Sequence, residues 1–226
     1  MNSITSLDAL SKECWNYVKK NNLSNKIKAT NDITDAWNYD RDLRNYELTL
    51  SFPIREFIQS KLNYLDSSSK FVILDVGCGS GKFLSDVESI DNRVVGYGIS
   101  NVLFPLDHHK NKIIMGDISA IKNNKTKKFY SIPDVPYVLP DIQNNSVDMI
   151  VSSYTLQYVS EIERIKVIRH SNRILKSDGL ALLHINNNFL SKGIVEKYVK
   201  NVGLPNCLMT PFYERFRLQI VHISKN

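Results

Sequence analysis

The chain has 226 residues, of which 42 % are hydrophobic, and this is enough to bury one sizeable core. Its formal net charge of +6 comes largely from a lysine cluster at residues 122–128 in an acid-free stretch, which favours a solvated loop over a nucleic-acid-binding face. Three scattered cysteines argue against a disulfide framework. The sequence has no apolar run of membrane-spanning length, and its first residues lack the pattern of a signal peptide. We therefore expect a cytoplasmic protein without a membrane partner.

Residues 1–70 are expected to form a helical N-terminal cap. Apolar residues recur at helical spacing in two segments, and Asp8 and Pro53 stand where these helices would begin. Between the two segments, Trp37, Tyr39 and Tyr46 belong to an aromatic and charged stretch. These side chains either pack the cap onto the core or contact a ligand held there, and both interpretations stay open. The helical segments contain Leu7, Leu10, Cys14, Tyr17 and Val18, and then Ile54, Phe57, Ile58 and Leu62.

The next segment, residues 72–76, is an apolar run that is closed by an acid and followed by three alternate glycines. The run is typical of a strand buried on both faces of a parallel sheet, with Asp75 near its end. Gly77, Gly79 and Gly81 accept positive φ angles and leave no steric wall against a ligand. The helix expected directly afterwards would point its free amide groups at that ligand. We therefore predict a binding site at the tip of this strand.

From Phe71 onward the sequence alternates between strand and helix patterns. This alternation predicts right-handed βαβ units and a mainly parallel sheet within residues 71–226. A long loop at about residues 119–146 interrupts the pattern; it carries the lysine cluster and then an aromatic, proline-stiffened half. Further strands are expected at residues 94–97, 113–115, 147–152, 180–185 and 216–223, with helices before residue 175 and around residues 195–202.

The glycine spacing resembles one known family. A dinucleotide-binding turn reads G-x-G-x-x-G, whereas this turn reads G-x-G-x-G after an acid and resembles motif I of the class I S-adenosylmethionine-dependent methyltransferases, especially the methyltransferase type 11 group. The resemblance implies an α/β fold: a Rossmann-like seven-stranded, mainly parallel sheet with helices on both faces and an antiparallel edge strand. Later segments resemble the same family in the same order, namely Gly116–Ile118, Asn145–Ser153, Leu156–Val159 and Arg173–Gly179.

The resemblance also implies a cofactor, S-adenosyl-L-methionine, with S-adenosyl-L-homocysteine as its product. The glycine turn would shape the methionine and ribose site. The segment after the third strand would hold adenine, because its aspartate carboxylate can accept a hydrogen bond from the exocyclic amino group of adenine. A tyrosine of the cap would fold over the cofactor. The implied cofactor-binding residues are Asp75, Gly77, Cys78, Gly79, Gly81, Ile99, Asp117, Ile118 and Tyr39.

One position departs from the family pattern. The second strand of the family usually ends in an acid that binds both ribose hydroxyls, and Gly98 stands in that place. A charge-assisted contact would then be missing unless Ser100, Asn101 or a cap residue replaces it. The departure keeps a non-catalytic cofactor-binding protein as an alternative.

Two residues are candidates for catalysis. Methyl transfer needs chiefly an aligned nucleophile, and it needs a general base only if that nucleophile starts protonated. Tyr154 and His184 follow or end the fourth and fifth expected strands, where ligands gather in open α/β sheets, although each is also plausible as a core or rim residue. No metal site is expected, since the adjacent His108 and His109 would point in different directions on a helix.

We therefore expect a methyltransferase that acts on an oxygen, nitrogen or carbon atom of a small molecule. Residues 152–155 lack the D/N-P-P-Y signature of many nucleic-acid amino-methyltransferases, which favours a small molecule. An RNA or protein methyltransferase that docks through the lysine loop is the alternative; nucleic acid is less favoured because the basic and aromatic residues are segregated. The sequence indicates neither the acceptor nor the oligomeric state.

Overall fold

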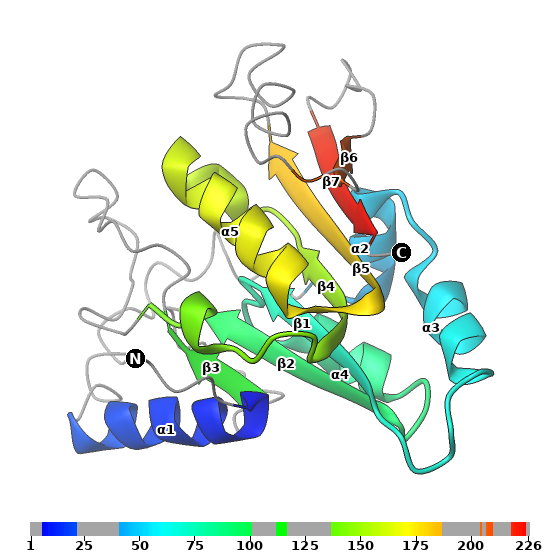
Figure 1. Ribbon diagram of the computed structural model, residues 1–226, viewed down its shortest axis with the longest axis horizontal. Coiled ribbons are helices and arrows are strands. Elements are labelled where there is room, and N and C mark those ends of the chain that lie inside the picture. Colours follow the sequence, from blue (N-terminus) through cyan, green and yellow to red (C-terminus); the bar gives the residue numbers. More distant parts are fainter. Residues whose placement is uncertain are drawn as a thin grey trace.

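The computed structural model describes residues 6–21, 41–100, 112–116, 137–186, 204, 207–209 and 218–224. These residues form a seven-stranded sheet in the order β3-β2-β1-β4-β5-β7-β6 (Figure 1). The first five strands in that order are parallel to their neighbours, and β7 is antiparallel to both β5 and β6. The strands are β1 (Phe71–Val76), β2 (Val94–Ser100), β3 (Ile113–Met115), β4 (Val147–Ser152), β5 (Leu175–Asn186), β6 (Cys207–Met209) and β7 (Leu218–Ser224).

The prediction of a mainly parallel, Rossmann-like sheet is confirmed. One detail is wrong: the closing strand was expected at the edge, but β7 lies between β5 and the three-residue strand β6, which forms the edge. A segment as short as β6 carries too few residues to show an alternating pattern, so its position could not be predicted.

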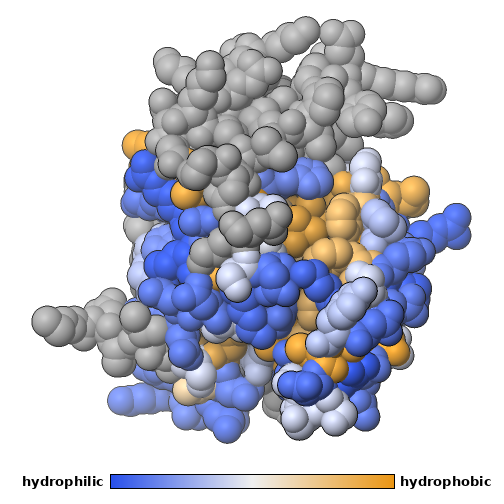
Figure 2. All heavy atoms as spheres, turned by 45° about the vertical axis from the view of Figure 1, so that its right-hand side comes forward, coloured by the Kyte–Doolittle hydropathy of each residue, from blue (hydrophilic) through white to orange (hydrophobic). Residues whose placement is uncertain are grey.

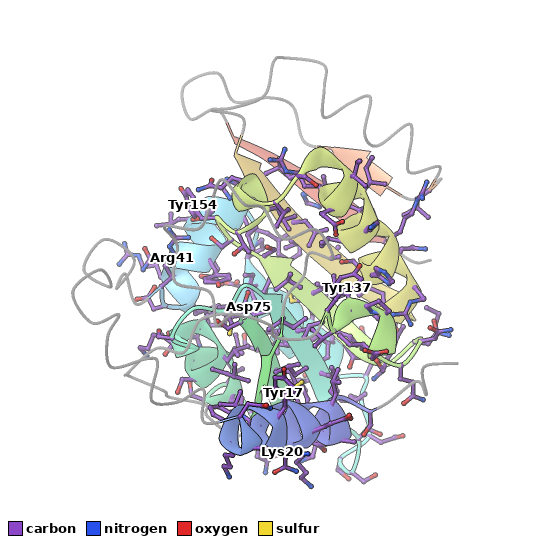
Figure 3. The ribbon with its side chains drawn as sticks, turned by 90° about the vertical axis from the view of Figure 1, so that its left-hand side faces the viewer. Tyr17, Lys20, Arg41, Asp75, Tyr137 and Tyr154 are labelled. Carbon is purple, nitrogen blue, oxygen red and sulfur yellow. The ribbon has the colours of Figure 1, made fainter. Side chains whose placement is uncertain are left out.

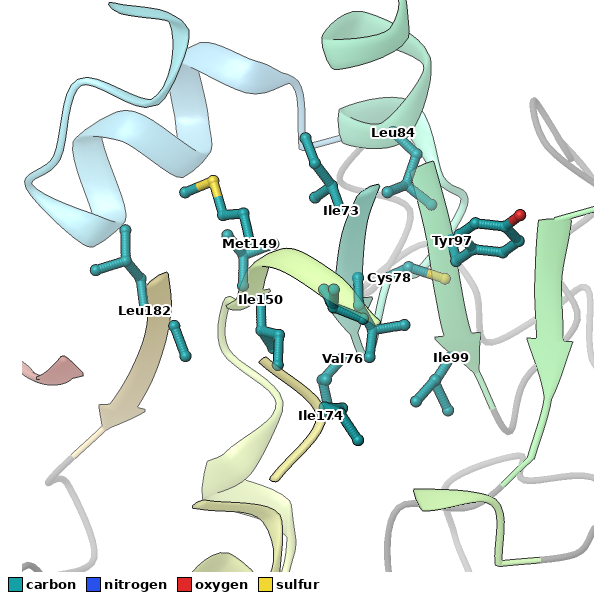
Figure 4. Close-up of a cluster of buried hydrophobic side chains, with 14 of the residues drawn as sticks. Ile73, Val76, Cys78, Leu84, Tyr97, Ile99, Met149, Ile150, Ile174 and Leu182 are labelled. Carbon is teal, nitrogen blue, oxygen red and sulfur yellow. The ribbon is translucent and has the colours of Figure 1, made fainter. Parts of the chain in front are cut away.

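The centre of the sheet is apolar on both faces. β1 lies between β2 and β4, and Ile73, Leu74 and Val76 are completely buried, as the uninterrupted apolar run predicts. Figure 4 shows Ile73 and Val76 in a cluster with residues of β2, β4 and β5. This packing fixes the position of the β1 end, where the glycine turn begins.

Helices cover both faces of the sheet. α4 (Lys82–Glu88) connects β1 to β2, and α5 (Glu161–Ile174) connects β4 to β5. The two connections run in opposite directions across the sheet, and right-handed crossovers therefore place the two helices on opposite faces (Figure 1). The strand order reverses between β1 and β4. Ligands of open α/β sheets bind at this switch point, outside the carboxyl ends of the strands.

In the described part of the chain, three helices precede β1. α1 (Leu7–Lys20) and α3 (Ile54–Leu62) lie where the helical spacing predicts them, and α2 (Leu43–Leu50) was not predicted. The Tyr97 hydroxyl donates to Asp8 Oδ1 at 2.7 Å and joins α1 to the sheet. The backbone N–H of Leu43 donates to Asp86 Oδ2 at 3.0 Å and joins α2 to α4. That residues 1–70 form a separate cap stays a prediction.

β5 begins earlier than the sequence predicts. Residues 177–179 were expected as a turn before a strand at 180–185, but β5 pairs with β4 from Leu175 onward. The register shifts between Val147, which pairs with Leu175, and Met149, which pairs with Leu180. The expected turn is therefore an irregularity inside the strand, where β5 has extra residues against β4.

Figure 2 shows the face that carries α2 and α3, where hydrophilic side chains surround a smaller hydrophobic area. Among the described residues, Leu48 of α2 is 70 % exposed and Tyr64 is 92 % exposed. None of the helices in the described part of the chain has the length and apolarity that a membrane span requires.

The close approach of α4 to β2 depends on glycine. A Cβ atom added to Gly96 would lie 3.1 Å from Leu84 Cδ2 and 3.2 Å from Leu84 Cβ. We expect Gly96→Val to lower the free energy of unfolding by about 1–3 kcal/mol, because overpacking forces the helix away from the sheet. Urea denaturation measures this, with Gly96→Ala as a milder control. Equal stability of Gly96→Val and wild type would contradict the close packing.

Candidate active site

The glycine turn after β1 has the backbone that its sequence predicts. Gly77, Gly79 and Gly81 have φ angles of 87°, 55° and 81°, which side-chain-bearing residues rarely adopt. The N–H groups of Gly77 and Cys78 both donate to the Ile99 carbonyl, at 3.0 and 3.2 Å. The end of β2 therefore holds the start of the turn in place.

The glycines of this turn face different surroundings. A Cβ atom on Gly77 would lie 2.1 Å from Thr155 Oγ1, so this glycine is needed for packing against the segment after β4. A Cβ atom on Gly79 would meet no described residue within 4 Å. The turn is thus closed on the Thr155 side and open at Gly79, where a ligand can approach the backbone.

Asp75 lies at 0 % exposure beneath the turn. The Tyr46 hydroxyl donates to its Oδ2 at 2.7 Å, and its Oδ1 has no hydrogen-bond partner in the described part of the chain. Burial raises the pKa of Asp75 to about 7, although the Tyr46 hydrogen bond and the charge of Arg41 act in the opposite direction. The same burial, and then Asp75 itself, raises the pKa of Tyr46 well above 10. A buried carboxyl with one unpartnered oxygen is suited to binding a cation or a donor.

The structure explains the glycine at the end of β2. A Cβ atom on Gly98 would lie 2.3 Å from Cys78 Sγ and 3.0 Å from Leu84 Cδ1. The side chain of Cys78 therefore occupies the space that an acidic side chain would enter from this position. Of the replacements considered from the sequence, Ser100 is 7 % exposed and Asn101 lies outside the described residues.

Tyr154 and His184 lie together at the carboxyl ends of β4 and β5. The Tyr154 backbone N–H donates to His184 Nδ1 at 3.1 Å, and the two rings are 4.5 Å apart in an edge arrangement. Tyr154 has a φ angle of 55°, a strained conformation for a tyrosine that is typical of functional segments. Their proximity follows from the pairing of β4 with β5.

Arg41, which precedes α2, lies beside Tyr154 at the carboxyl ends of β4 and β5; we call Arg41, Tyr154 and His184 the Tyr154 corner. Its guanidinium carbon lies 4.0 Å from the centroid of the Tyr154 ring, and its Nη1 donates to the carbonyl and hydroxyl of Ser153, each at 3.4 Å. Burial and, secondly, the charge of Arg41 lower the pKa of His184 to about 4, so His184 is neutral at pH 7. Figure 3 shows Arg41 beside Tyr154, with Asp75 below them.

Other predicted site residues lie elsewhere. Ile99 is completely buried among apolar side chains that include Val76 (Figure 4), so its expected contact with adenine stays a prediction. Tyr39, Asp117 and Ile118 lie outside the described residues, as does most of the 119–146 loop. No group of three or more potential metal ligands lies together in the ranges that the structure describes.

Sequence reasoning missed two residues that shape the site. Arg41 and Thr155 contact it from segments far from the glycine turn in sequence. Tyr46 was expected to pack the N-terminal segment onto the core or to contact a ligand; it packs on Phe83, with ring centroids 4.1 Å apart, and its hydroxyl also donates to Asp75. The signal that could have found Arg41 was its position within the aromatic and charged stretch between the two predicted helices.

Comparisons with known proteins indicate the family and the fold. A family model described as "Methyltransferase domain" matches residues 46–211. An uncharacterised protein of Methanocaldococcus jannaschii is 24 % identical over 162 residues, which cover 72 % of this chain and 55 % of that protein. The chain thus spans about half the length of this curated relative.

Two solved structures have the same fold. A TehB-like SAM-dependent methyltransferase from Corynebacterium glutamicum is 16 % identical, with a TM-score of 0.50 over 95 % of this chain and 99 % of that one. The 1,6-didemethyltoxoflavin-N1-methyltransferase of Burkholderia thailandensis, solved with 1,6-didemethyltoxoflavin and S-adenosylhomocysteine, is 10 % identical, with a TM-score of 0.50 over 90 % of this chain and 87 % of that one.

The charge state of Asp75 makes stability depend on pH. Its pKa is about 7 when folded and 3.8 as a model value, so between these values the unfolded chain loses a proton that the folded chain keeps. The Asp75 contribution to the free energy of unfolding should then fall by about 1.4 kcal/mol per pH unit as pH rises through this window. Denaturant titrations should show it as a stability difference between wild type and Asp75→Asn that becomes less favourable to wild type as pH rises.

His184 supplies the matched control, because its pKa falls from 6.5 to about 4 on folding. Its contribution has the opposite sign: stability is complete above pH 6.5 and is lost as pH falls toward 4. His184→Gln should remove that loss and leave the Asp75 decline in place. A stability difference between wild type and Asp75→Asn that is constant from pH 4 to 7 would contradict the raised pKa.

Proposed function

Because this chain belongs to the family of methyltransferase domains, we propose that it transfers a methyl group from S-adenosyl-L-methionine to an oxygen, nitrogen or carbon atom of a small molecule. S-adenosyl-L-homocysteine would be released. When bound, the cofactor supplies an electrophilic methyl group on a sulfonium. The chain would bind it, exclude water and hold the acceptor in line.

One observation carries the proposal: within the described part of the chain, the turn is open at Gly79, and the buried Asp75 carboxyl just before the turn has an oxygen without a hydrogen-bond partner. Burial raises the pKa of Asp75 to about 7, and a cation bound near the carboxyl would favour its charged form. The methionine part of the cofactor carries an ammonium and a sulfonium, and both fit such a carboxyl. The position at the switch point between β1 and β4 supports the same assignment.

We propose the following division of roles. Asp75, Cys78 and the three turn glycines bind the methionine and ribose parts of the cofactor. Ile99, Asp117, Ile118 and Tyr39 would contact the adenosine part, and this rests on the family resemblance. Tyr154 and His184 would line the acceptor side. A cytoplasmic location is part of the proposal, and the three scattered cysteines, which do not suggest a disulfide framework, support it.

A cofactor-binding protein without turnover is the second candidate. The observation that favours it is the Cys78 side chain, which fills the space beside Gly98 and leaves β2 without an acid for the ribose hydroxyls. Such a protein would bind S-adenosyl-L-homocysteine and transfer no methyl group to any acceptor.

The turn can be tested by filling its open side. We expect Gly79→Arg to abolish binding of S-adenosyl-L-homocysteine, because the new side chain enters the space that is open at this position. Isothermal titration calorimetry measures the binding, and circular dichroism verifies the fold. Ser68→Arg adds the same charge at an exposed position and should bind as wild type does. Unchanged binding by Gly79→Arg would refute the assignment of the turn.

The class of acceptor can be tested with labelled cofactor. Cell extract separated into small molecules, RNA and protein should accept a tritiated methyl group in the small-molecule fraction. Labelling of RNA or protein that weakens steeply with added salt would instead favour docking through the lysine loop. Cofactor binding with no labelled fraction would favour the non-catalytic candidate.

A further inference from the structure

The tautomer of His184 follows from one hydrogen bond. Its Nδ1 accepts the Tyr154 backbone N–H at 3.1 Å, so Nδ1 carries no proton. In a neutral imidazole the proton must then lie on Nε2, which becomes a donor. This arrangement leaves His184 without a free lone pair on either ring nitrogen. His184 is therefore suited to donating a hydrogen bond rather than to accepting a proton.

That donor has no acceptor in the described part of the chain. His184 is 0 % exposed, and its Nε2 has no hydrogen-bond partner among the residues that the structure describes. Leaving a buried N–H group unsatisfied costs about 1–3 kcal/mol, and such groups are rare in folded proteins. A bound molecule with an oxygen acceptor would remove this cost.

A positive charge lies in the same stack of side chains. Arg41 packs on one side of the Tyr154 ring, and the His184 ring also contacts Tyr154. The described hydrogen bonds and ring contacts of the Arg41 guanidinium are with Ser153 and Tyr154; its charge also acts on Asp75, but no carboxylate in the described ranges forms an ion pair with it. Its remaining N–H groups form a fork that suits a planar oxyanion.

We propose that Arg41 and the Nε2–H of His184 form an oxyanion site that binds a carboxylate of a reactant. This inference deepens the proposed function, since the site lies at the ends of β4 and β5, across the switch point from β2. The carboxylate belongs either to the amino-acid part of the cofactor or to an acidic methyl acceptor. In both cases His184 is a neutral donor in the bound state, and Arg41 supplies the charge.

The two sources of the carboxylate can be separated by calorimetry. One arm compares S-adenosyl-L-homocysteine with its decarboxylated analogue. The other arm titrates the protein, with and without S-adenosyl-L-homocysteine, with pairs of equal shape and different charge: acetate and acetamide, benzoate and benzamide. We expect the wild type to prefer the carboxylate in at least one arm, by tenfold or more.

Variants assign that preference to the two residues. Arg41→Gln should abolish the preference for the carboxylate, and Arg41→Lys should restore part of it, which a purely structural role of the stack would not do. His184→Phe keeps the ring and removes the donor, and it should weaken carboxylate binding several-fold while leaving the amide or decarboxylated partner unaffected. Lys70→Gln, at an exposed position of the described chain, removes one positive charge elsewhere and is the control.

Nitrogen-15 NMR of the His184 ring gives a readout that does not depend on the stability of any variant. The free protein should show a neutral Nε2–H tautomer at pH 7, and the carboxylate should shift the Nε2–H resonance more than its uncharged partner does. An Nδ1–H tautomer, or an equal response to both members of every pair in both arms, would overturn the proposal. A wild type that binds carboxylates but not S-adenosyl-L-homocysteine would support the oxyanion site and contradict the proposed cofactor.

Discussion

The hydrogen bond from Tyr46 to Asp75 is the contact on which the site depends. It joins a helix that precedes the sheet to the central strand, directly beneath the glycine turn. The same tyrosine stacks on Phe83 of α4, so one side chain holds α2, α4 and β1 together. Because Asp75 is fully buried, this donor is the one described group that stabilises its charge by direct contact. Loss of the contact would loosen the helix and leave the carboxyl without any partner.

The sequence predicted those parts of the fold that depend on local pattern. β1 and β4 are apolar runs flanked by turn residues, and their observed bounds differ from the predicted ones by at most one residue. α2 was missed because its buried residues, Leu43, Tyr46 and Leu50, alternate with charged and polar ones over only two turns. β6 was missed because three residues show no period. Both elements are set by tertiary contacts, which outweigh local propensity in short segments.

The candidate site was predictable where chain position alone fixes it. The turn glycines, Asp75, Tyr154 and His184 were chosen from the glycine motif and from positions at or just after strand ends, and the strand order brings them to one edge. Arg41 and Thr155 could not be found in this way, because their roles come from contacts across long sequence separations. The glycine at position 98 looked like a missing acid in the sequence, and only the position of the Cys78 side chain shows why a larger residue is disfavoured there.

Thr155 packs against the place where Gly77 would carry a side chain, and its hydroxyl donates to the Gly77 carbonyl at 3.3 Å. The segments that leave β1 and β4 therefore share a single wall. A close-packed wall cannot shift on one side alone, so a molecule that pushes the Tyr154 corner outward must also move the backbone of the glycine turn. The segments that follow β1 and β4 would therefore move together, and ligands bound at the glycine turn and beside Tyr154 would affect each other's binding without direct contact.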